Sequence, residues 1–155
     1  MVLNEGDPAP DFDLETDTGR VRLSDLKGRI VVLYFYPKDD TPGCTKEAIG
    51  FSEKRAEFEA LGATVVGVSK DSAKSHGKFR EKYGLDLVLG SSPDNEMLER
   101  YGVWIEKSMY GRTYMGIDRA TFLIDAQGLV RRVWRKVKVP GHADAVLEAA
   151  RSVAG

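Results

Sequence analysis

Seven consecutive apolar residues, IVVLYFY at positions 30–36, constrain the fold of this chain more than any other feature. A strand with one face in water alternates apolar and polar residues, whereas a strand covered on both faces is apolar throughout. Such strands lie in the middle of a mainly parallel sheet, with helices on both faces. The run is also too short to span a bilayer, which requires about 20 apolar residues. We therefore predict an α/β protein built around this strand.

The rest of the chain supplies elements that suit such a sheet. Helical spacing of apolar residues, or an apolar run typical of a strand, marks each of them. Helices are predicted at 45–61, 72–83, within 93–102 and at 143–153; strands are predicted at 64–69, 87–91, 120–125 and 129–139, after a Gly-rich connection. Near the N-terminus, two short strands around Thr18-Gly19 indicate a hairpin, and Ser24 is a plausible N-cap of one helical turn. The expected architecture is a central sheet flanked by helices.

Length, charge and cysteine content exclude several classes of protein. A chain of 155 residues with a formal net charge of −1 is most simply one domain, 1–155, with no general attraction to nucleic acid or anionic membranes. One cysteine cannot form an intramolecular disulfide, and the first residues, MVLNEGDPAPDF, lack the basic and apolar regions of a secretory signal. We therefore expect a cytoplasmic protein with no membrane partner.

The single cysteine, Cys44, follows the loop PKDDTPG at the start of the predicted helix. A helix N-terminus stabilises an anion, and a thiolate is an anion. On the helix, Cys44 shares a face with Ala48 and Phe51, so its sulfur should point toward the sheet and be partly exposed. Alternatively, Cys44 is only a small hydrophobic residue of the core. Its expected burial and the presence of a single cysteine, taken alone, favour this alternative.

The residues before Cys44 favour a reactive thiol. Thr41 lies three positions earlier, so its hydroxyl could reach either the sulfur or a backbone N–H of the first helical turn; an ordinary N-cap role is about equally good. Pro42 and Gly43 form a tight turn that brings backbone amides close to whatever the sulfur attacks.

Several ordered motifs, from GDPAPDF to the hairpin near residue 130, resemble a known family. P-x-x-x-T-x-x-C at 37–44, FREKYGL and YGVWIEKSMYGRTYMGIDRATFLID are similar to the peroxiredoxins, and within them to the bacterioferritin-comigratory, or Q-type, subgroup. The resemblance implies an α/β, thioredoxin-like fold: a central mixed β-sheet flanked by helices, with an N-terminal β-hairpin extension. It also implies a thiol peroxidase with no metal, haem or flavin, acting on hydrogen peroxide and small organic hydroperoxides.

The resemblance assigns roles to five residues. It implies that Cys44 is the peroxidatic nucleophile, that Thr41 hydrogen-bonds thiolate and peroxide, and that Pro37 shields the pocket. Arg119 would approach the sulfur from the neighbouring strand, and Glu47 would orient Arg119. Taken alone, an Arg at a strand start is more often a surface charge, and Glu47 could equally be a first-turn partner of the helix dipole.

The chain departs from its relatives in the resolving cysteine. Many members carry one five residues after the nucleophile, where this chain has Ile49, and the predicted helix 72–83 has none. The chain therefore requires an external thiol reductant, which could be thioredoxin, glutaredoxin or glutathione. We expect a monomer or a weak homodimer.

Two other functions remain to be compared with the peroxidase on the same residues. A disulfide reductase needs C-x-x-C, and Thr41 stands where the first Cys would be. A non-enzymatic binding or holdase module would use Cys44 structurally. The isolated His76 and His142 suggest solvated surface residues.

Two further stretches of the sequence can be interpreted. The charged stretch 131–139 is typical of a sheet edge. Trp104, Met109 and Tyr110 could wall the pocket or pack on the core.

Overall fold

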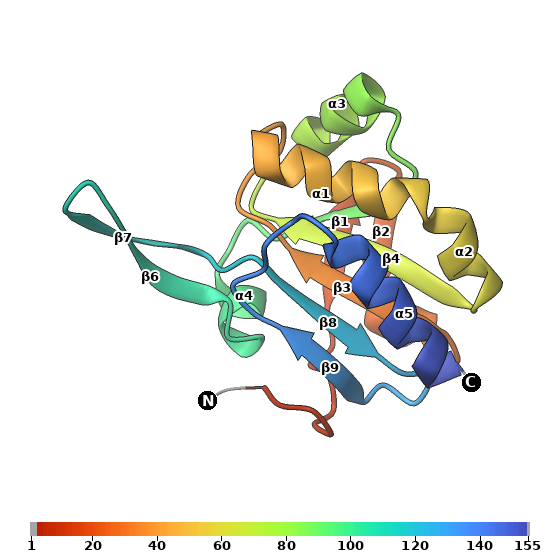
Figure 1. Cartoon of the computed structure of the whole chain (residues 1–155). Helices are drawn as coiled ribbons and strands as arrows, with labels where there is room; N and C mark the ends of the chain where they lie inside the picture. The colour runs from red at the N-terminus through yellow and green to blue at the C-terminus, as the bar shows by residue number, and fades with distance from the viewer. Residues whose placement is uncertain (1–2, 155) are drawn as a thin grey trace.

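The computed structural model describes residues 3–154, and its largest element is a seven-stranded sheet with the order β2-β1-β5-β4-β3-β8-β9 (Figure 1). The strands are β1 (Asp13–Thr16), β2 (Gly19–Arg22), β3 (Ile30–Phe35), β4 (Ala63–Ser69), β5 (Val88–Ser91), β8 (Ala120–Ile124) and β9 (Val130–Trp134). Strand β3 runs parallel to β4 and antiparallel to β8, so the sheet is mixed. β1 and β2 form the predicted N-terminal hairpin, and β9 lies at the edge, as its charges predicted.

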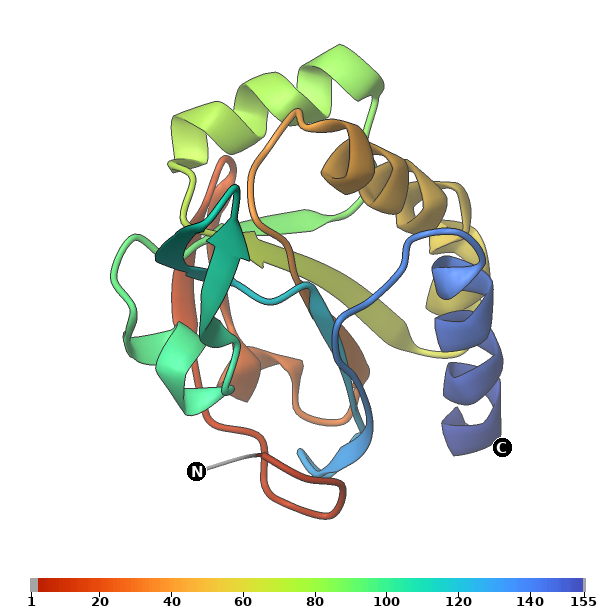
Figure 2. The same ribbon diagram turned by 60° about the vertical axis from the view of Figure 1, so that its left-hand side comes forward.

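Helices cover both faces of this sheet. They are α1 (Pro42–Glu53), α2 (Arg55–Ala60), α3 (Ala73–Tyr83), α4 (Glu96–Arg100) and α5 (His142–Ala154), with a 3-10 helix, η1 (Leu23–Leu26), after β2. In Figure 2, α1, α2 and α5 lie on one side of the sheet and α4 on the other. Val32 and Tyr34 of β3 enter the core under α1, α2, α3 and α5, whereas Val31, Leu33 and Phe35 enter the core under α4. The apolar run therefore has the cause that we predicted: both faces of its strand are buried.

Two helix boundaries differ from the prediction. The helix expected at 45–61 is two helices, because the Lys54 N–H donates to the carbonyl of Phe51, three residues back instead of four, and interrupts the α-helical pattern. Ser24 is not an N-cap, since η1 begins after Arg22 and has no side-chain cap. The helix predicted at 72–83 matches α3, and the Ser72 side chain caps it by accepting a hydrogen bond from the Ser75 N–H at 3.1 Å.

The predicted Gly-rich connection is instead a second hairpin, made of β6 (Trp104–Met109) and β7 (Arg112–Ile117). Its two strands pair only with each other, and the hairpin projects from the body of the molecule (Figure 1). The turn, Tyr110-Gly111, has positive φ angles of 53° and 77° at its two residues. This geometry suits a two-residue turn between twisted strands.

Both histidines that we expected at the surface are buried, so that prediction is wrong. His76 is 0% exposed, with Nδ1 2.8 Å from Asp39 Oδ2 and Nε2 3.1 Å from the Gly90 carbonyl oxygen. His142 Nε2 lies 2.8 Å from Thr121 Oγ1. Buried polar groups are tolerated where such partners exist. Burial, together with the charge of Arg119, lowers the pKa of His142 to about 4.

No helix within residues 3–154 combines the length and apolar character that crossing a membrane requires.

Candidate active site

Cys44 is the third residue of α1, one loop beyond the carboxyl end of β3. Its side chain is 1% exposed and belongs to the core cluster that contains Tyr34, Ala48 and Phe51. We predicted a partly exposed sulfur, and the structure corrects this: the helical face that carries Cys44 packs directly on the sheet. The sulfur is therefore held in a fixed position near the helix N-terminus, where an anion is stabilised.

Arg119 reaches this sulfur from the adjoining strand. It immediately precedes β8, which pairs with β3. Its Nη2 donates to Cys44 Sγ at 3.3 Å, and its Nη1 donates to Glu47 Oε1 at 2.7 Å. Burial lowers the pKa of Arg119, but Glu47 and Cys44 raise it more, and the result is a pKa above the ordinary value. The guanidinium thus stays charged and bridges the thiol and the carboxylate.

Gly43 makes this approach possible. A Cβ on Gly43 would lie 3.1 Å from Arg119 Nη2, closer than side chains ordinarily pack. From the sequence we predicted that Gly43 exposes backbone amides. Its second role, to leave room for the guanidinium, could not be found from sequence because the two residues are far apart along the chain.

Glu47 is buried behind Arg119. Its side chain is 1% exposed, and Oε2 has no hydrogen-bond partner among the described residues. Burial raises the pKa of Glu47 to about 7, although the charge and hydrogen bond of Arg119 act to lower it. The hydroxyl of Tyr34 is likewise buried without a partner. A carboxyl group that titrates near neutral pH therefore lies one hydrogen bond away from the guanidinium that contacts the sulfur.

Thr41 and Pro37 lie in the loop before the helix. Thr41 is the N-cap residue of α1, in extended conformation, but its side chain makes no cap hydrogen bond. Instead, its hydroxyl donates to the Lys38 carbonyl at 2.8 Å, so neither target that we predicted is the one used. With its proton engaged, the Thr41 oxygen is oriented as an acceptor. Pro37 is exposed in the same loop, and its shielding role stays a prediction.

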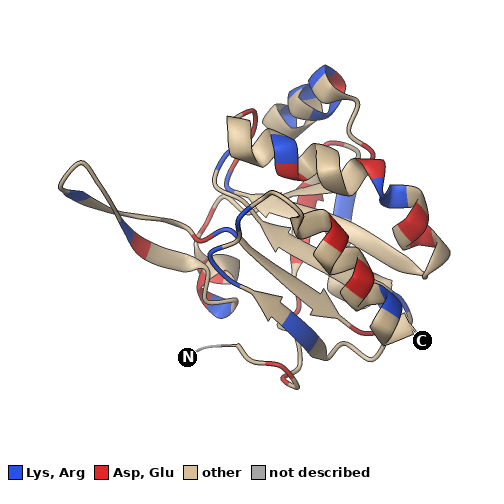
Figure 3. Ribbon diagram, in the orientation of Figure 1, with Lys and Arg blue, Asp and Glu red and all other residues tan. Residues whose placement is uncertain are grey.

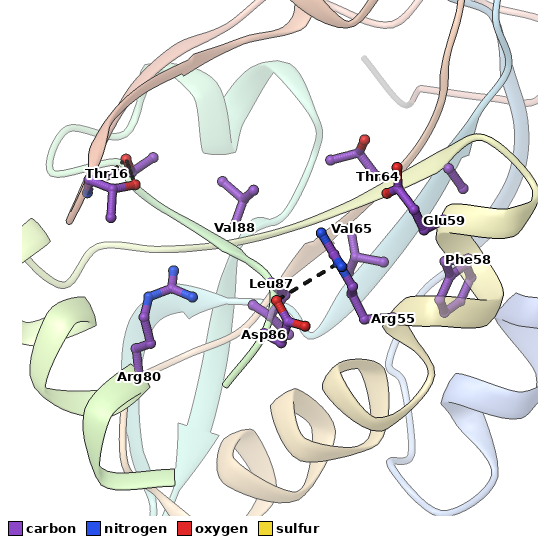
Figure 4. A pocket seen from close by; sticks show the side chains of 12 residues that line it. Thr16, Arg55, Phe58, Glu59, Thr64, Val65, Arg80, Asp86, Leu87 and Val88 are labelled. Atoms are coloured by element: carbon purple, nitrogen blue, oxygen red, sulfur yellow. Dashed lines mark hydrogen bonds and ion pairs between the residues drawn. The ribbon is translucent and has the colours of Figure 1, made fainter. Parts of the chain in front are cut away.

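The pocket in Figure 4 lies elsewhere on the molecule. It has a volume of about 270 Å³ and is lined in part by Thr64, Arg80 and an ion pair between Arg55 and Asp86 at 3.8 Å. It lies at the start of β4, whereas Cys44 follows the opposite, carboxyl end of the parallel strand β3. Within residues 3–154 there is also no group of three or more His, Cys, Asp or Glu side chains that could hold a metal ion.

Comparisons with known proteins agree with this geometry. Residues 5–133 match the model of the AhpC/TSA family. The peroxiredoxin Bcp of Bacillus subtilis is 47% identical over 149 residues, which cover 96% of this chain and 95% of that protein. The peroxiredoxin Bcp of Escherichia coli is 43% identical over 146 residues, or 94% of each chain.

Solved structures extend the comparison to the whole fold. The bacterioferritin comigratory protein of Xanthomonas campestris, described with an alkyl peroxide reduction activity, superposes with a TM-score of 0.91 at 43% identity over 99% of both chains. A peroxiredoxin Q mutant from Xylella fastidiosa gives a TM-score of 0.93 at 39% identity, over 100% of this chain and 99% of that one.

The chain therefore belongs to the AhpC/TSA family of peroxiredoxins, and its relatives there are of the bacterioferritin-comigratory, or Q, type. The predicted thioredoxin-like fold is confirmed. The chain is a thiol-dependent peroxidase, with a peroxide substrate and a thiol reductant, so the peroxidase hypothesis is confirmed over the reductase and binding-module alternatives.

Replacing Glu47 with Gln is expected to change how stability depends on pH. The pKa of Glu47 is about 7 in the folded chain against an ordinary value of 4.5, so between these pH values the native state holds a proton that the unfolded state has released. This group therefore makes the free energy of unfolding fall as pH rises from 4.5 to 7. The fall is about 3 kcal/mol in total.

His142 acts in the opposite direction and would mask this effect in the parent protein. Its pKa of about 4 lies below the ordinary 6.5, so this group makes stability rise with pH over that range. Denaturant unfolding of both proteins should therefore be compared between pH 5 and 8. The Gln variant should gain stability relative to the parent as pH rises to 7, whereas Glu53→Gln, at an exposed position on α1, should show a constant difference. A constant difference for Glu47→Gln would contradict the raised pKa.

Proposed function

We propose that Cys44 is the peroxidatic nucleophile of this enzyme. The thiolate attacks the terminal oxygen of a hydroperoxide, the O–O bond breaks, and the products are a cysteine sulfenic acid and an alkoxide, which takes up a proton to become an alcohol. The observation that carries the proposal is the Arg119 guanidinium, which donates to Cys44 Sγ at 3.3 Å while Glu47 holds its other nitrogen at 2.7 Å. A fixed cation beside the sulfur stabilises negative charge on it, as nucleophilic attack requires.

The surrounding residues fit the steps of this reaction. The protonated Arg119 can stabilise both the thiolate and the oxygen on which charge develops as the O–O bond breaks. The Thr41 oxygen, whose proton is given to the Lys38 carbonyl, can accept a hydrogen bond from the peroxide O–H. Glu47 fixes the guanidinium, and we assign to Pro37 the shielding of the pocket entrance.

We propose hydrogen peroxide and small organic hydroperoxides as substrates. The activity described for the Xanthomonas campestris relative supports the organic class. The reaction that we derive from Cys44 and Arg119 needs no metal, haem or flavin, because the sulfur itself accepts the oxygen.

Recycling requires two thiols from outside the chain, which has one cysteine. The first thiol condenses with the sulfenic acid to give a mixed disulfide and water; the second releases the Cys44 thiol and leaves the reductant as a disulfide. We propose thioredoxin, glutaredoxin or glutathione as the reductant, acting on a monomer or weak homodimer. Because these thiols must be kept reduced, we propose the cytoplasm as the compartment.

The expected product of one turnover without thiol is a stable sulfenic acid. With stoichiometric peroxide, intact mass spectrometry should show a monomer that has gained one oxygen and reacts with dimedone, and excess peroxide should add a second oxygen irreversibly, as sulfinic acid. The absence of any internal trapping thiol is the reason, since position 49 holds Ile. Rapid conversion to a Cys44–Cys44 dimer on non-reducing gels, with no dimedone adduct, would replace this mechanism with one that bridges two subunits.

A further inference from the structure

The hairpin β6–β7 concentrates nearly all the large apolar side chains that the described residues expose. We define the hairpin patch as Met109, Tyr110, Tyr114 and Met115, with exposures of 56%, 98%, 44% and 49%. Among residues 3–154, the only other exposed large hydrophobic side chain is Leu129, at 37%. Met109 and Tyr114 lie on one face of the ribbon, Met115 lies on the other, and Tyr110 is in the turn. Isolated apolar residues at a surface need no explanation, but a projecting ribbon that exposes apolar side chains on both faces and at its turn indicates an interaction site.

Tyr110 is an unfavourable choice for the turn that it occupies. Its φ of 53° lies in the left-handed region, which Gly and Asn adopt readily and a bulky side chain adopts at a cost. Its ring is 98% exposed, so it contributes almost nothing to the core. A strained residue that serves neither the turn nor the packing points to a function outside the folded chain.

Basic residues lie where the hairpin joins the body (Figure 3). We define the basic segment as 135–138, which contains Arg135, Lys136 and Lys138 and no acidic residue. Its backbone is fixed there, because the Lys136 N–H donates to Asp118 Oδ1 at 3.3 Å and the Val137 N–H donates to the carbonyl of Arg119 at 3.0 Å. Lys136 and Lys138 are exposed on either side of Val137, the residue whose N–H is bonded to the carbonyl of Arg119.

The body end of the hairpin leads directly to the active site. Strand β7 ends at Ile117, two residues before Arg119. Lys107 of β6 is half-buried, and burial lowers its pKa, while the charges of Asp118, Arg119 and Cys44 also act on it. A protein that covers both the hairpin and the basic segment would therefore lie beside Arg119, which contacts Cys44.

We propose that the hairpin patch and the basic segment form the docking surface for the protein thiol that recycles Cys44. The partner that fits is an acidic redox protein with an apolar surface around its reactive cysteine: apolar contacts would bury the hairpin patch, and carboxylates would pair with the basic segment. A second copy of this chain is the alternative occupant, and sedimentation distinguishes it from a redox protein. This inference rests on the proposed function, which requires an external thiol to reach the sulfur.

The test measures the oxidation of Cys44 and the reduction of its sulfenic acid in separate steps. Each protein is first oxidised with stoichiometric peroxide, and the rate constant for reducing its sulfenic acid is then measured with a negatively charged thioredoxin, with a glutaredoxin and with dithiothreitol. Two variants remove parts of the surface, Tyr110→Asn and the double variant Lys136→Gln/Lys138→Gln. Leu129→Ser is the matched control, since it removes an exposed apolar side chain at the opposite end of β8 from Arg119.

Both surface variants should react at least about tenfold more slowly with whichever redoxin reduces the parent protein. Their reactions with peroxide and with dithiothreitol should be unchanged, and Leu129→Ser should match the parent throughout. Because Asn suits the left-handed turn, Tyr110→Asn should also melt at the same or a higher temperature than the parent. The loss in the lysine variant should shrink at high salt.

Several outcomes would overturn the proposal. Equal losses with dithiothreitol would mean that the hairpin shapes the site instead of binding a partner, and unchanged redoxin rates would exclude this surface. If neither redoxin reduces a parent that dithiothreitol does reduce, the docking proposal fails while the peroxidase mechanism stands. If sedimentation shows a dimer of the parent that Tyr110→Asn dissociates, the surface is a self-association interface. A parent that peroxide does not oxidise would instead refute the proposed role of Cys44.

Discussion

Replacing Cys44 with Ser should abolish peroxide consumption while the protein stays folded. A serine hydroxyl supplies almost no alkoxide near neutral pH, so the nucleophile is lost. The change is nearly isosteric, and the Ser hydroxyl could still accept the hydrogen bond that Arg119 donates to the sulfur. Peroxide consumption with dithiothreitol as reductant measures the effect, and circular dichroism and thermal melting verify the fold.

The matched control for this experiment is Thr45→Ser, the next position on α1, which should keep most of the parent rate. The serine variant should also lose the dimedone adduct that the parent forms. Residual turnover of Cys44→Ser above a few per cent of the parent would remove the cysteine from the mechanism.

Replacing Arg119 with Ala should lower the second-order rate constant for peroxide by about 10²–10³-fold, the usual effect of losing a donor that stabilises developing charge. The variant loses a partly buried cation and both hydrogen bonds, to Cys44 Sγ and to Glu47 Oε1. The rate constant of Arg119→Lys should lie between those of the parent and Arg119→Ala, since an ammonium keeps the charge but cannot reproduce the planar fork of the guanidinium. Stopped-flow measurement of the oxidation step gives these rates directly.

A second readout tests whether Arg119 acts on the thiolate. Alkylation by iodoacetamide should slow in Arg119→Ala, because the sulfur loses the neighbouring cation that stabilises its negative charge. Arg131→Lys is the control: Arg131 is half-exposed and paired with Asp125 at 3.4 Å, and its loss should change neither rate. Unaltered oxidation and alkylation in Arg119→Ala would leave Arg119 with a structural role only.

The sequence was most informative where one local pattern has one physical cause. The run at 30–36 required burial on both faces, and the side chains of β3 do alternate between two cores. Gly84 marked the end of α3, because its φ of 61° suits Gly. The position of Cys44 at a helix start followed from the turn residues before it.

The sequence did not predict features whose cause lies far away along the chain or is unusual. The hairpin β6–β7 was missed because Tyr-Gly is not among the dipeptides typical of its turn. The burial of His76 depends on Asp39 and on the Gly90 carbonyl, which no local pattern connects to it. Within the candidate site, Arg119 and Cys44 are 75 residues apart, so family resemblance alone brought them together before the structure did.

The shared guanidinium of Arg119 links the oxidation state of the sulfur to a proton. While Cys44 is a thiolate, its negative charge takes up part of the positive charge of the cation, and Glu47, whose pKa is already raised by burial, is favoured in its protonated form. When the sulfur becomes a neutral sulfenic acid, the cation is left to Glu47 alone, which favours the ionised carboxylate and release of its proton. The alkoxide formed in the same step needs one proton to become an alcohol. Because one guanidinium serves both groups, oxidation of the proposed nucleophile is coupled to the protonation state of Glu47.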